Sequence, residues 1–420
     1  MKKRTFLKNV GMLGMVPLIS PFTPSSPSVI AYNPKEFIDN EEELWTIVRS
    51  HYQLHPDFIN LESGYYNIIP QPTVNALVKH IHRVNLEGSF YMREHRFDDK
   101  YSITDQLAKV VGCSGDQLII TRNTTESLDL VIGGYPWKKG DEAIHALQDY
   151  GAMQDMFTQI ADRHGVIIKK VSVPNHPKSD EEIVALYESQ ITPKTKLMMV
   201  CHMINITGHI LPIKKICEMA HRHGVEVMVD GAHCIGHFDF KIEDLNCDYY
   251  GSSLHKWLAT PLGAGLLYIK KEHTSKLWPL LADGEKNPES IVRLSHVGTH
   301  PVHTDLTIVD AMEYLQWIGI HRKENRLRSL KERWLTALKD HPNIKINTPF
   351  ESEKSCGIGN IGLKNMTPAE LAQRLFHDFK IFTVAIDYAN VQGCRISPNV
   401  FTTVEEIDIF VEAMKTLATA

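Results

Sequence analysis

The chain has 420 residues, of which 43% are hydrophobic and 23% charged, and its formal net charge is −5. This composition indicates a globular protein with a core large enough for two domains, and it excludes a disordered chain and a bundle of membrane-spanning helices. Seven cysteines without a C-x-x-C spacing exclude a zinc ribbon, a haem-attachment motif and a disulfide scaffold. No long run of Lys and Arg indicates a nucleic-acid partner, so small-molecule chemistry is the default expectation.

The first 27 residues are predicted to be an export signal. The first eight positions hold four basic side chains, and the apolar stretch 10–22 is interrupted by Gly and Pro, so it is too short and broken to span a membrane. Residues 3–8 resemble a twin-arginine signal in which Lys3 replaces the first arginine. We therefore expect a periplasmic or exported protein without stable membrane insertion. Ordinary secretion and a cytoplasmic location are the alternatives.

Aliphatic runs alternate with helical stretches from Asp116 onward. The predicted strands lie at residues 118–120, 166–168, 197–200, 225–229 and 266–269, and two of the helices between them at 153–163 and 214–223. Parallel strands need a crossover between neighbours, so this alternation predicts a mainly parallel sheet with helices on both faces. The expected fold class is α/β, with a large domain over residues 60–290.

The pattern changes after Arg293. A long helical stretch over 305–341, short strands near Ile344 and at 358–363, and a final helix from Val404 are expected there. These elements predict a smaller α+β domain over residues 291–420. Residues 28–59 are expected to pack on this domain as an N-terminal segment.

Two motifs follow successive strands and indicate the chemistry. Residues 229–233 read VDGAH, and residues 251–257 read GSSLHKW. An acid such as Asp230 at a strand end can pair with a protonated ring nitrogen, and a lysine such as Lys256 with a lowered pKa can attack an aldehyde. Together they are the groups that a pyridoxal cofactor needs. Taken separately, they are consistent with a strand-end cap and a solvated surface lysine.

This arrangement resembles the class V aminotransferase family, whose members are pyridoxal-phosphate enzymes of fold type I, over nearly all of the chain after residue 60. The Ser-x-His-Lys-Trp sequence and the absence of a lyase cysteine are most similar to the isopenicillin-N-epimerase-like branch. The resemblance implies a large domain with a seven-stranded, mainly parallel sheet, and pyridoxal 5′-phosphate as the cofactor. It makes Lys256 the Schiff-base lysine and Asp230 the partner of the pyridinium nitrogen. His233 and Asn205 are then donors to the ring oxygen.

The phosphate of such a cofactor needs neutral donors and the start of a helix. Asn123 can cap a helix after the strand at 118–120, and Glu126 completes a capping-box-like pair, so free amide groups point at a bound anion. By the resemblance, the phosphate is held by Thr124, Thr125, Ser253 and His255. Helix capping alone is the alternative for the two threonines.

Three further residues are assigned by the resemblance. Tyr150 stands where an aromatic ring covers the cofactor, and its hydroxyl can take part in proton transfer; a packed core tyrosine is the alternative. Thr299 resembles a segment contributed by the other subunit, which implies a homodimer with shared sites, against a simple turn. Arg395 matches the carboxylate-binding arginine, whose planar fork suits an α-carboxylate, against a structural salt bridge. Weaker candidates for the pocket are Tyr65, Tyr66, Tyr91 and Arg93.

The sequence leaves the reaction open between several outcomes. A cysteine desulfurase needs a reactive thiol on a loop before the carboxylate-binding arginine, but no cysteine lies between residues 358 and 390. Epimerisation, transamination and β-elimination, including C–S lyase chemistry, remain, with Lys256 as the proton carrier in each. A metal site is not expected, because the 22 histidines form no H-E-x-x-H pattern.

We therefore expect an exported, homodimeric pyridoxal-phosphate enzyme that acts at the amino-bearing carbon of an amino acid or a peptide-like metabolite. It is expected to be an aminotransferase or an isopenicillin-N-epimerase-like enzyme. The alternative from another class is a non-catalytic protein of the same fold that only binds a metabolite.

Overall fold

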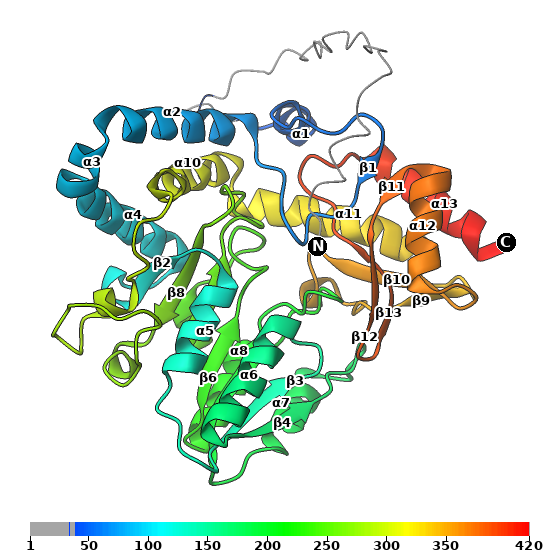
Figure 1. Cartoon of the computed structure of the whole chain (residues 1–420). Coiled ribbons are helices and arrows are strands. Elements are labelled where there is room, and N and C mark those ends of the chain that lie inside the picture. The colour runs from blue at the N-terminus through cyan, green and yellow to red at the C-terminus, as the bar shows by residue number, and fades with distance from the viewer. Residues whose placement is uncertain (1–32, 34–37, 420) are drawn as a thin grey trace, which may run out of the picture.

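The protein has two main sheets, a larger one and a smaller one, and each is covered by helices (Figure 1). The computed structural model describes residue 33 and residues 38–419, so the predicted export signal lies outside the described residues. Within this part of the chain, no helix is long and apolar enough to cross a membrane.

The large domain is built on a seven-stranded sheet in the order β2-β8-β7-β6-β5-β3-β4. Its strands are β2 (Leu118–Thr121), β3 (Glu142–Ala146), β4 (Ile167–Val171), β5 (Thr195–Cys201), β6 (Glu226–Asp230), β7 (Tyr249–Ser253) and β8 (Gly265–Ile269). Neighbouring strands are parallel except at β8, which is antiparallel to β2 and β7. This sheet confirms the predicted α/β class. The sequence analysis does not predict the strand β3, because Glu142 and His145 interrupt its apolar run.

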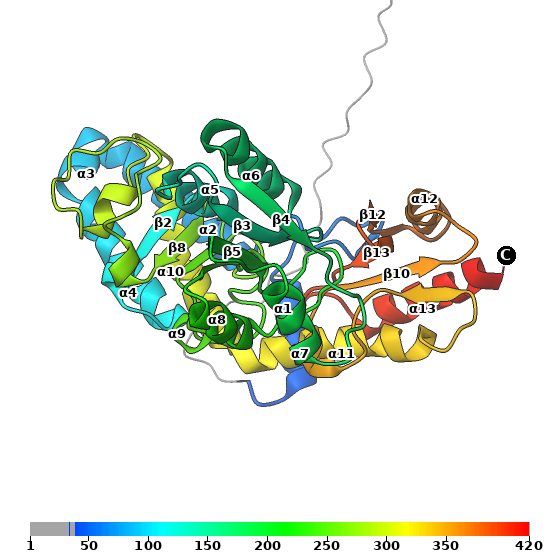
Figure 2. The same ribbon diagram turned by 90° about the horizontal axis from the view of Figure 1, so that it is seen from below.

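Helices cover both faces of the large sheet (Figure 2). One face packs on α5 (Thr124–Gly134) and α6 (Gly151–His164), and the other on α4 (Arg96–Val111), α7 (Asp180–Glu188) and α8 (Ile213–Arg222). Successive residues of β6 enter opposite cores, Met228 on one face and Val227 and Val229 on the other. Because both faces are buried, the central strands are continuous apolar runs, which is the pattern that the sequence shows. The chain also forms the short helices α3 (Ser89–Glu94) and α9 (Ile242–Leu245).

The small domain carries a four-stranded antiparallel sheet in the order β12-β13-β10-β9. Its strands and helices are β9 (Ile344–Ile346), β10 (Gly359–Leu363), β12 (Val384–Tyr388), β13 (Val391–Ile396), α11 (Ile320–Leu338), α12 (Pro368–Phe379) and α13 (Val404–Thr419). The rings of Trp334 and Phe410 meet in its core. The short strands and the final helix therefore lie close to the positions that the sequence predicts.

The described part of the N-terminal segment contacts the small domain, and its Leu44, Trp45 and Val48 also share a hydrophobic cluster with Tyr314 and Ile318. The two-residue strand β1 (Ile59–Asn60) pairs in parallel with β11 (Ile381–Phe382). Arg49 of α1 (Glu41–Ser50) forms a two-pronged ion pair with Glu406 of α13, with N–O distances of 3.0 and 2.8 Å. Residues 60 onward then lead from the small domain to the edge of the large one.

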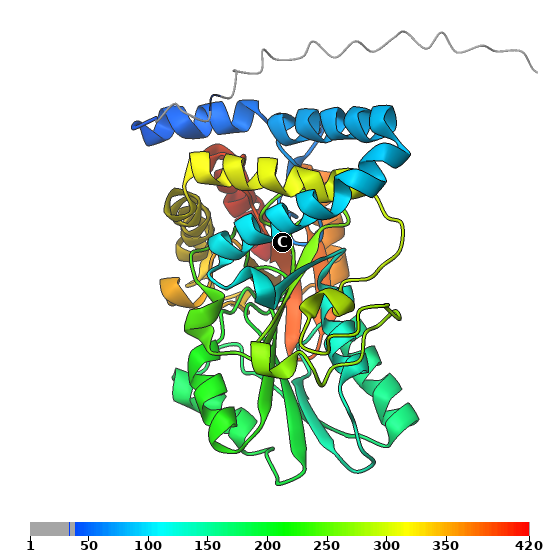
Figure 3. The same ribbon diagram turned by 90° about the vertical axis from the view of Figure 1, so that its left-hand side faces the viewer.

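The long helical stretch predicted over 305–341 is two helices, α10 (Val302–Ile318) and α11, which are separated at Gly319. Gly319 has φ of 85°, a conformation that favours glycine and ends the first helix. The helix α10 packs on α2 (Gln71–Glu87) and α4, and its Leu306 and Leu315 belong to the core of the large domain (Figure 3). Residues 302–318, which the sequence analysis assigns to the small domain, thus pack in the core of the large one.

Candidate active site

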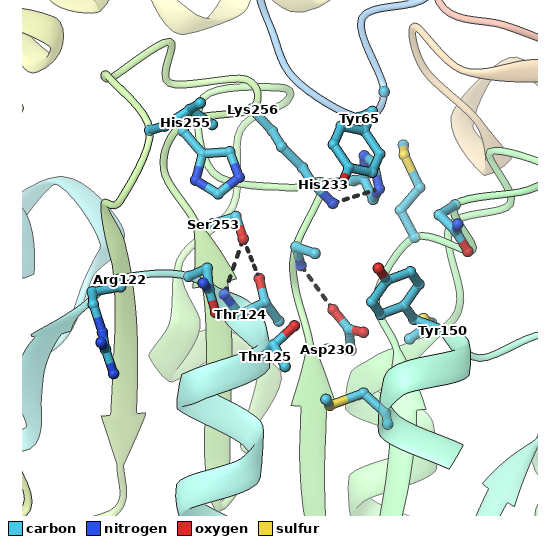
Figure 4. Close-up of a pocket in the computed structure, with 18 of the residues that line it drawn as sticks. Tyr65, Arg122, Thr124, Thr125, Tyr150, Asp230, His233, Ser253, His255 and Lys256 are labelled. Atoms are coloured by element: carbon cyan, nitrogen blue, oxygen red, sulfur yellow. Dashed lines mark hydrogen bonds between the residues drawn. The ribbon is translucent and has the colours of Figure 1, made fainter. Parts of the chain in front are cut away.

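The carboxyl ends of β5, β6 and β7 border a cavity of about 390 Å³ (Figure 4). Parallel sheets place ligands at this edge, because loops from several strand ends converge there. The predicted site residues that line the cavity are Thr124, Thr125, Tyr150, Asn205, Asp230, His233, Ser253, His255, Lys256 and Arg395. The predicted Thr299 does not line it. Residues from both domains therefore meet in one cavity of a single chain.

The amine of Lys256 faces one histidine ring. Its Nζ lies 3.1 Å from His233 Nε2, and the indole N–H of Trp257 donates to His233 Nδ1 at 3.3 Å. Because an indole nitrogen only donates, Nδ1 is the acceptor and the neutral ring carries its proton on Nε2. Burial lowers the pKa of Lys256 to about 8 and the pKa of His233 well below its usual value. The N–H of His233 therefore points at an amine that loses its proton at a lower pH than the amine of an exposed lysine.

Trp257 is held by groups that the sequence analysis does not identify. The buried Lys323 of α11 donates to the Trp257 carbonyl, and the ring of His237 stacks on the indole with centroids 3.6 Å apart. His237 donates from Nδ1 to the His233 carbonyl and accepts from the Gly357 N–H, both at 2.8 Å. The small domain thus supports the lysine loop from behind. A lysine in a charged helix gives no local signal of such a role.

Asp230 ends β6 at the floor of the cavity and is almost fully buried, at 4% exposed. Its Oδ1 accepts the N–H of Ala232 at 3.0 Å, and burial raises its pKa. A second carboxyl, Asp149, lies behind it, accepts the N–H of Ala146 at 2.7 Å and has a pKa raised to about 8 by burial and by Asp230. Asp149 is therefore mostly protonated at neutral pH, and Asp230 is the acid that faces the cavity.

The start of α5 forms the opposite end of the cavity. Asn123 caps the helix, because its side-chain oxygen accepts the N–H of Glu126 at 2.9 Å. The N–H and hydroxyl of Thr124 contact the Ser253 hydroxyl at 2.9 and 2.7 Å, which joins the helix start to β7. These hydroxyls and amides at a helix N-terminus form a site suited to an anion. We call this site, formed by Thr124, Ser253 and the start of α5, the anion cup.

The predicted capping-box-like pair is only half correct. The Glu126 carboxylate accepts the backbone N–H of Arg122 at 2.6 Å and pairs with the Arg122 guanidinium, so it does not close back on Asn123. Arg122 competes successfully because its charge adds to the hydrogen bond. The sequence analysis does not single out Arg122, although it lines the cavity.

His255 lies beside this cup. Its Nδ1 lies 3.3 Å from the Ala264 carbonyl, to which it donates, and burial lowers its pKa to about 4. The ring is therefore neutral in the absence of an anion.

Two tyrosines enter the cavity from different parts of the chain. Tyr150 immediately precedes α6 and is 48% exposed, and Tyr65 comes from the loop after β1 and is 77% exposed (Figure 4). Tyr150 is thus not a packed core residue. Among the weaker candidates, Tyr66, Tyr91 and Arg93 do not line the cavity, and Tyr91 is buried under the guanidinium of Arg83.

Arg395 of β13 lines the cavity and is also ion-paired. Its Nε and Nη2 donate to the carboxylate of Glu62 at 3.0 and 2.5 Å, and its Nη1 donates to the Asn205 carbonyl at 3.3 Å. The salt bridge that the sequence left open is therefore present. The sequence analysis does not identify Glu62, because it precedes Arg395 by 333 residues and no local motif marks it.

Thr299 lies in an exposed loop before α10, away from the cavity of its own chain. Its contribution to the site of a second subunit stays a prediction. Among the described residues, no group of three or more His, Cys, Asp or Glu side chains is arranged to hold a metal ion.

The sequence model of the family described as aminotransferase class-V matches residues 68–410. The chain belongs to the class V aminotransferase family. This confirms the family that the VDGAH and GSSLHKW motifs indicate.

Several known proteins resemble this chain over most of its length. Isopenicillin N epimerase from Streptomyces clavuligerus is 26% identical over 89% of this chain and 98% of its own. A cysteine desulfurase from Haloferax volcanii is 25% identical over 76% of this chain and 77% of its own. The apo cysteine desulfurase of Thermococcus onnurineus NA1 superposes with a TM-score of 0.78 at 21% identity, covering 89% of this chain and 97% of the other. The last comparison confirms the fold.

Proposed function

We propose that this class V protein is an enzyme that exchanges the proton on the amino-bearing carbon of an amino acid or peptide-like metabolite, as an epimerase does. Its cofactor is pyridoxal 5′-phosphate. The observation that carries the proposal is that Lys256, whose pKa burial lowers to about 8, lines one cavity together with the buried acid Asp230 and the anion cup at α5.

The cavity fits this cofactor by the chemistry of its donors. Asp230 would pair with the ring nitrogen, His233 Nε2–H would donate to the ring oxygen, and Lys256 would bind the aldehyde carbon. Thr124 and Ser253, with the start of α5, would hold the phosphate. When bound, the cofactor withdraws electrons from the substrate carbon, which makes the proton on that carbon removable.

The residues of this chain divide the work of moving that proton. Lys256 takes and returns it at Nζ, because burial keeps its pKa near 8 and both protonation states are accessible. Tyr65 and Tyr150 line the cavity with hydroxyl groups from other elements and are the candidates for a second proton carrier. Two carriers on different sides of one carbon are what epimerisation requires. The open donors of Arg395 hold the substrate carboxylate.

Desulfurase chemistry is poorly supported by the cysteines. Among the described residues, Cys201 is the cysteine that lines the cavity, and it is buried at the end of β5 with a pKa raised well above its usual value by burial. A persulfide-forming thiol must instead be a mobile thiolate.

The reaction is tested with the purified protein in deuterated water and a panel of L- and D-amino acids and amino-terminal glutamyl peptides. Deuterium entry at the amino-bearing carbon with inversion of configuration supports epimerisation. Conversion of the cofactor to its amine form establishes transamination, and release of ammonia with an oxo-acid establishes a lyase; either result contradicts the proposal. In an enzyme, Lys256→Ala should abolish deuterium exchange with every compound of the panel. If the protein only binds a metabolite, the Lys256→Ala variant should still bind it.

We also propose that the chain is exported, as its first 27 residues indicate. A reporter that is active only outside the cytoplasm, fused after residue 27, should become active. The matched control replaces Lys3 and Arg4 by glutamine, and equal reporter activity in both fusions would contradict the twin-arginine route.

A further inference from the structure

Glu62 lies behind the cavity wall, in the segment between β1 and Gly64. Its side chain and that of Arg395 are buried, with residue exposures of 7% and 6%. Besides the two guanidinium donors, its carboxylate accepts the Tyr65 N–H at 2.9 Å and the Ser397 hydroxyl at 3.2 Å. These donors belong to the backbone of Tyr65 and to side chains at or just after β13, so they fix the orientation of the carboxylate. The oriented carboxylate in turn fixes the guanidinium of Arg395.

The remaining donors of Arg395 can be counted. A guanidinium has five N–H donors in one plane, with one on Nε and two on each Nη. Glu62 takes the Nε donor and one on Nη2, and the Asn205 carbonyl takes one on Nη1. One donor on Nη1 and one on Nη2 remain. Two donors on neighbouring nitrogens form the fork that binds a carboxylate with both of its oxygens.

Gly64 holds the other side of the guanidinium. A Cβ atom at this position would lie 2.7 Å from Cζ of Arg395 and 2.9 Å from its Nε and Nη2. Such contacts are shorter than van der Waals packing allows. The guanidinium is therefore confined between the backbone of Gly64 and the carboxylate of Glu62.

We propose that Glu62 is a positioning residue that turns the fork of Arg395 toward the cavity, so that the site selects substrates with a carboxylate on the reacting carbon. The inference rests on the proposed function. The charge of Glu62 balances that of Arg395, so a ligand carboxylate gains affinity by matching two oriented donors rather than by meeting a net positive charge.

Two small nucleophiles test this without knowledge of the substrate. Aminooxyacetate and methoxyamine both displace Lys256 from the bound cofactor, but only the first carries a carboxylate. The loss of the visible absorbance of the lysine-bound cofactor gives a rate constant for each with the holoenzyme. The ratio of the two rate constants reports how strongly the site binds the carboxylate, because a general loss of reactivity lowers both rate constants alike.

We expect the wild-type holoenzyme to prefer aminooxyacetate. In Glu62→Gln and in Gly64→Ala this preference should fall by about tenfold, because a charge-assisted hydrogen bond to the carboxylate is lost or misplaced. The methoxyamine rate constant should stay unchanged, because methoxyamine has no carboxylate. Gly64→Ala keeps both charges and requires no positive φ, so it tests position alone.

Matched controls lie outside the cavity. Glu406→Gln breaks the similar two-pronged ion pair with Arg49, and Gly284→Ala adds a methyl group where no atom lies within 4 Å. Both should keep the wild-type ratio. A preference that survives in Glu62→Gln and Gly64→Ala, or is absent from the wild type, overturns the inference. A wild type that methoxyamine does not attack overturns the proposed function itself, because that reaction involves no carboxylate.

Discussion

Trp257 is linked to Lys256, the lysine proposed to react, through the ring of His233. Its indole N–H sets the tautomer of His233, and that tautomer presents Nε2–H to Lys256. Trp257→Phe removes the donor but keeps an aromatic ring against His237. We expect the variant to fold and its kcat to fall about fivefold to tenfold, because one buried hydrogen bond is worth about 1 kcal/mol. Steady-state rates test this, with Trp334→Phe in the small-domain core as the control. An unchanged kcat would show that the tautomer has no catalytic role.

The lowered pKa of Lys256 has a direct consequence for cofactor uptake. Burial lowers this pKa from 10.5 to about 8, so the neutral, nucleophilic amine accumulates as the pH rises through 8. Protein freed of cofactor should therefore take up pyridoxal 5′-phosphate faster as the pH rises, and the rate should level off above about 8. The growth of absorbance at a series of pH values measures this. A rate that still climbs at about pH 10 would assign Lys256 the pKa of an ordinary exposed lysine.

The residues proposed to carry the chemistry were predictable because they occupy local motifs at strand ends, as Asp230 and Lys256 do. The residues that support them were not. Glu62 meets Arg395 across 333 positions of the chain. Lys323 sits in a helix rich in charge, where burial and a carbonyl partner leave no trace in the pattern. Pairings made by tertiary packing are invisible to a sequence read in short windows.

At the scale of elements, Gly319 separates two helices that the sequence joins. The aliphatic and aromatic residues continue across it, so only its φ of 85° decides the break. Gly319→Ala forces an L-residue into that region and should destabilise the fold by about 1 kcal/mol. Urea unfolding compares this variant with Gly284→Ala, where the glycine has no positive φ and an added Cβ meets no atom within 4 Å. Equal midpoints for the two variants would mean that the junction relaxes without cost.

The helix α11 carries the buried amine that supports the lysine loop. Burial lowers the pKa of Lys323 from 10.5 to about 7, so between these values the unfolded chain binds more protons than the folded one. Stability from this group therefore rises with pH across that window and is lost below it. In Lys323→Met this contribution disappears, so the variant's melting temperature should gain less than that of the wild type between pH 7 and about 10. If the melting temperatures of the wild type and of Lys323→Met rise equally with pH, the Lys323 amine is solvated rather than buried.

Fold prediction succeeded for strands that are buried on both faces, because a continuous aliphatic run such as that of β5 fits few structures besides a buried strand. It failed where polar residues enter a central strand, as in β3, and where one glycine redirects a helix. The consequence for function is small, because β6 belongs to the predictable part and the motif at residues 251–257 is read directly from the sequence. The consequence for domain organisation is larger, since α10 joins the large domain.

At the scale of the whole molecule, the cavity combines residues from both domains of one chain. Tyr65, Tyr150 and Leu262 line it and are substantially exposed, at 77%, 48% and 61%. Exposed apolar surface at the mouth of a site is typical of a region covered by another chain or by a ligand. The predicted homodimer with shared sites would supply that cover.

Hybrid dimers distinguish a shared site from a separate one. Thr299→Glu places a negative charge in the segment predicted to complete the site of the other subunit, and Lys256→Ala removes the amine proposed to react, so each variant alone should be inactive. If Thr299 of the partner subunit completes each site, a hybrid of the two variants contains one site with both Lys256 and Thr299 intact. Mixing under conditions that exchange subunits should then restore activity. If Thr299 acted within its own chain, no site of the hybrid would be intact and the mixture would stay inactive. Sedimentation of the mixture confirms that dimers form in either case.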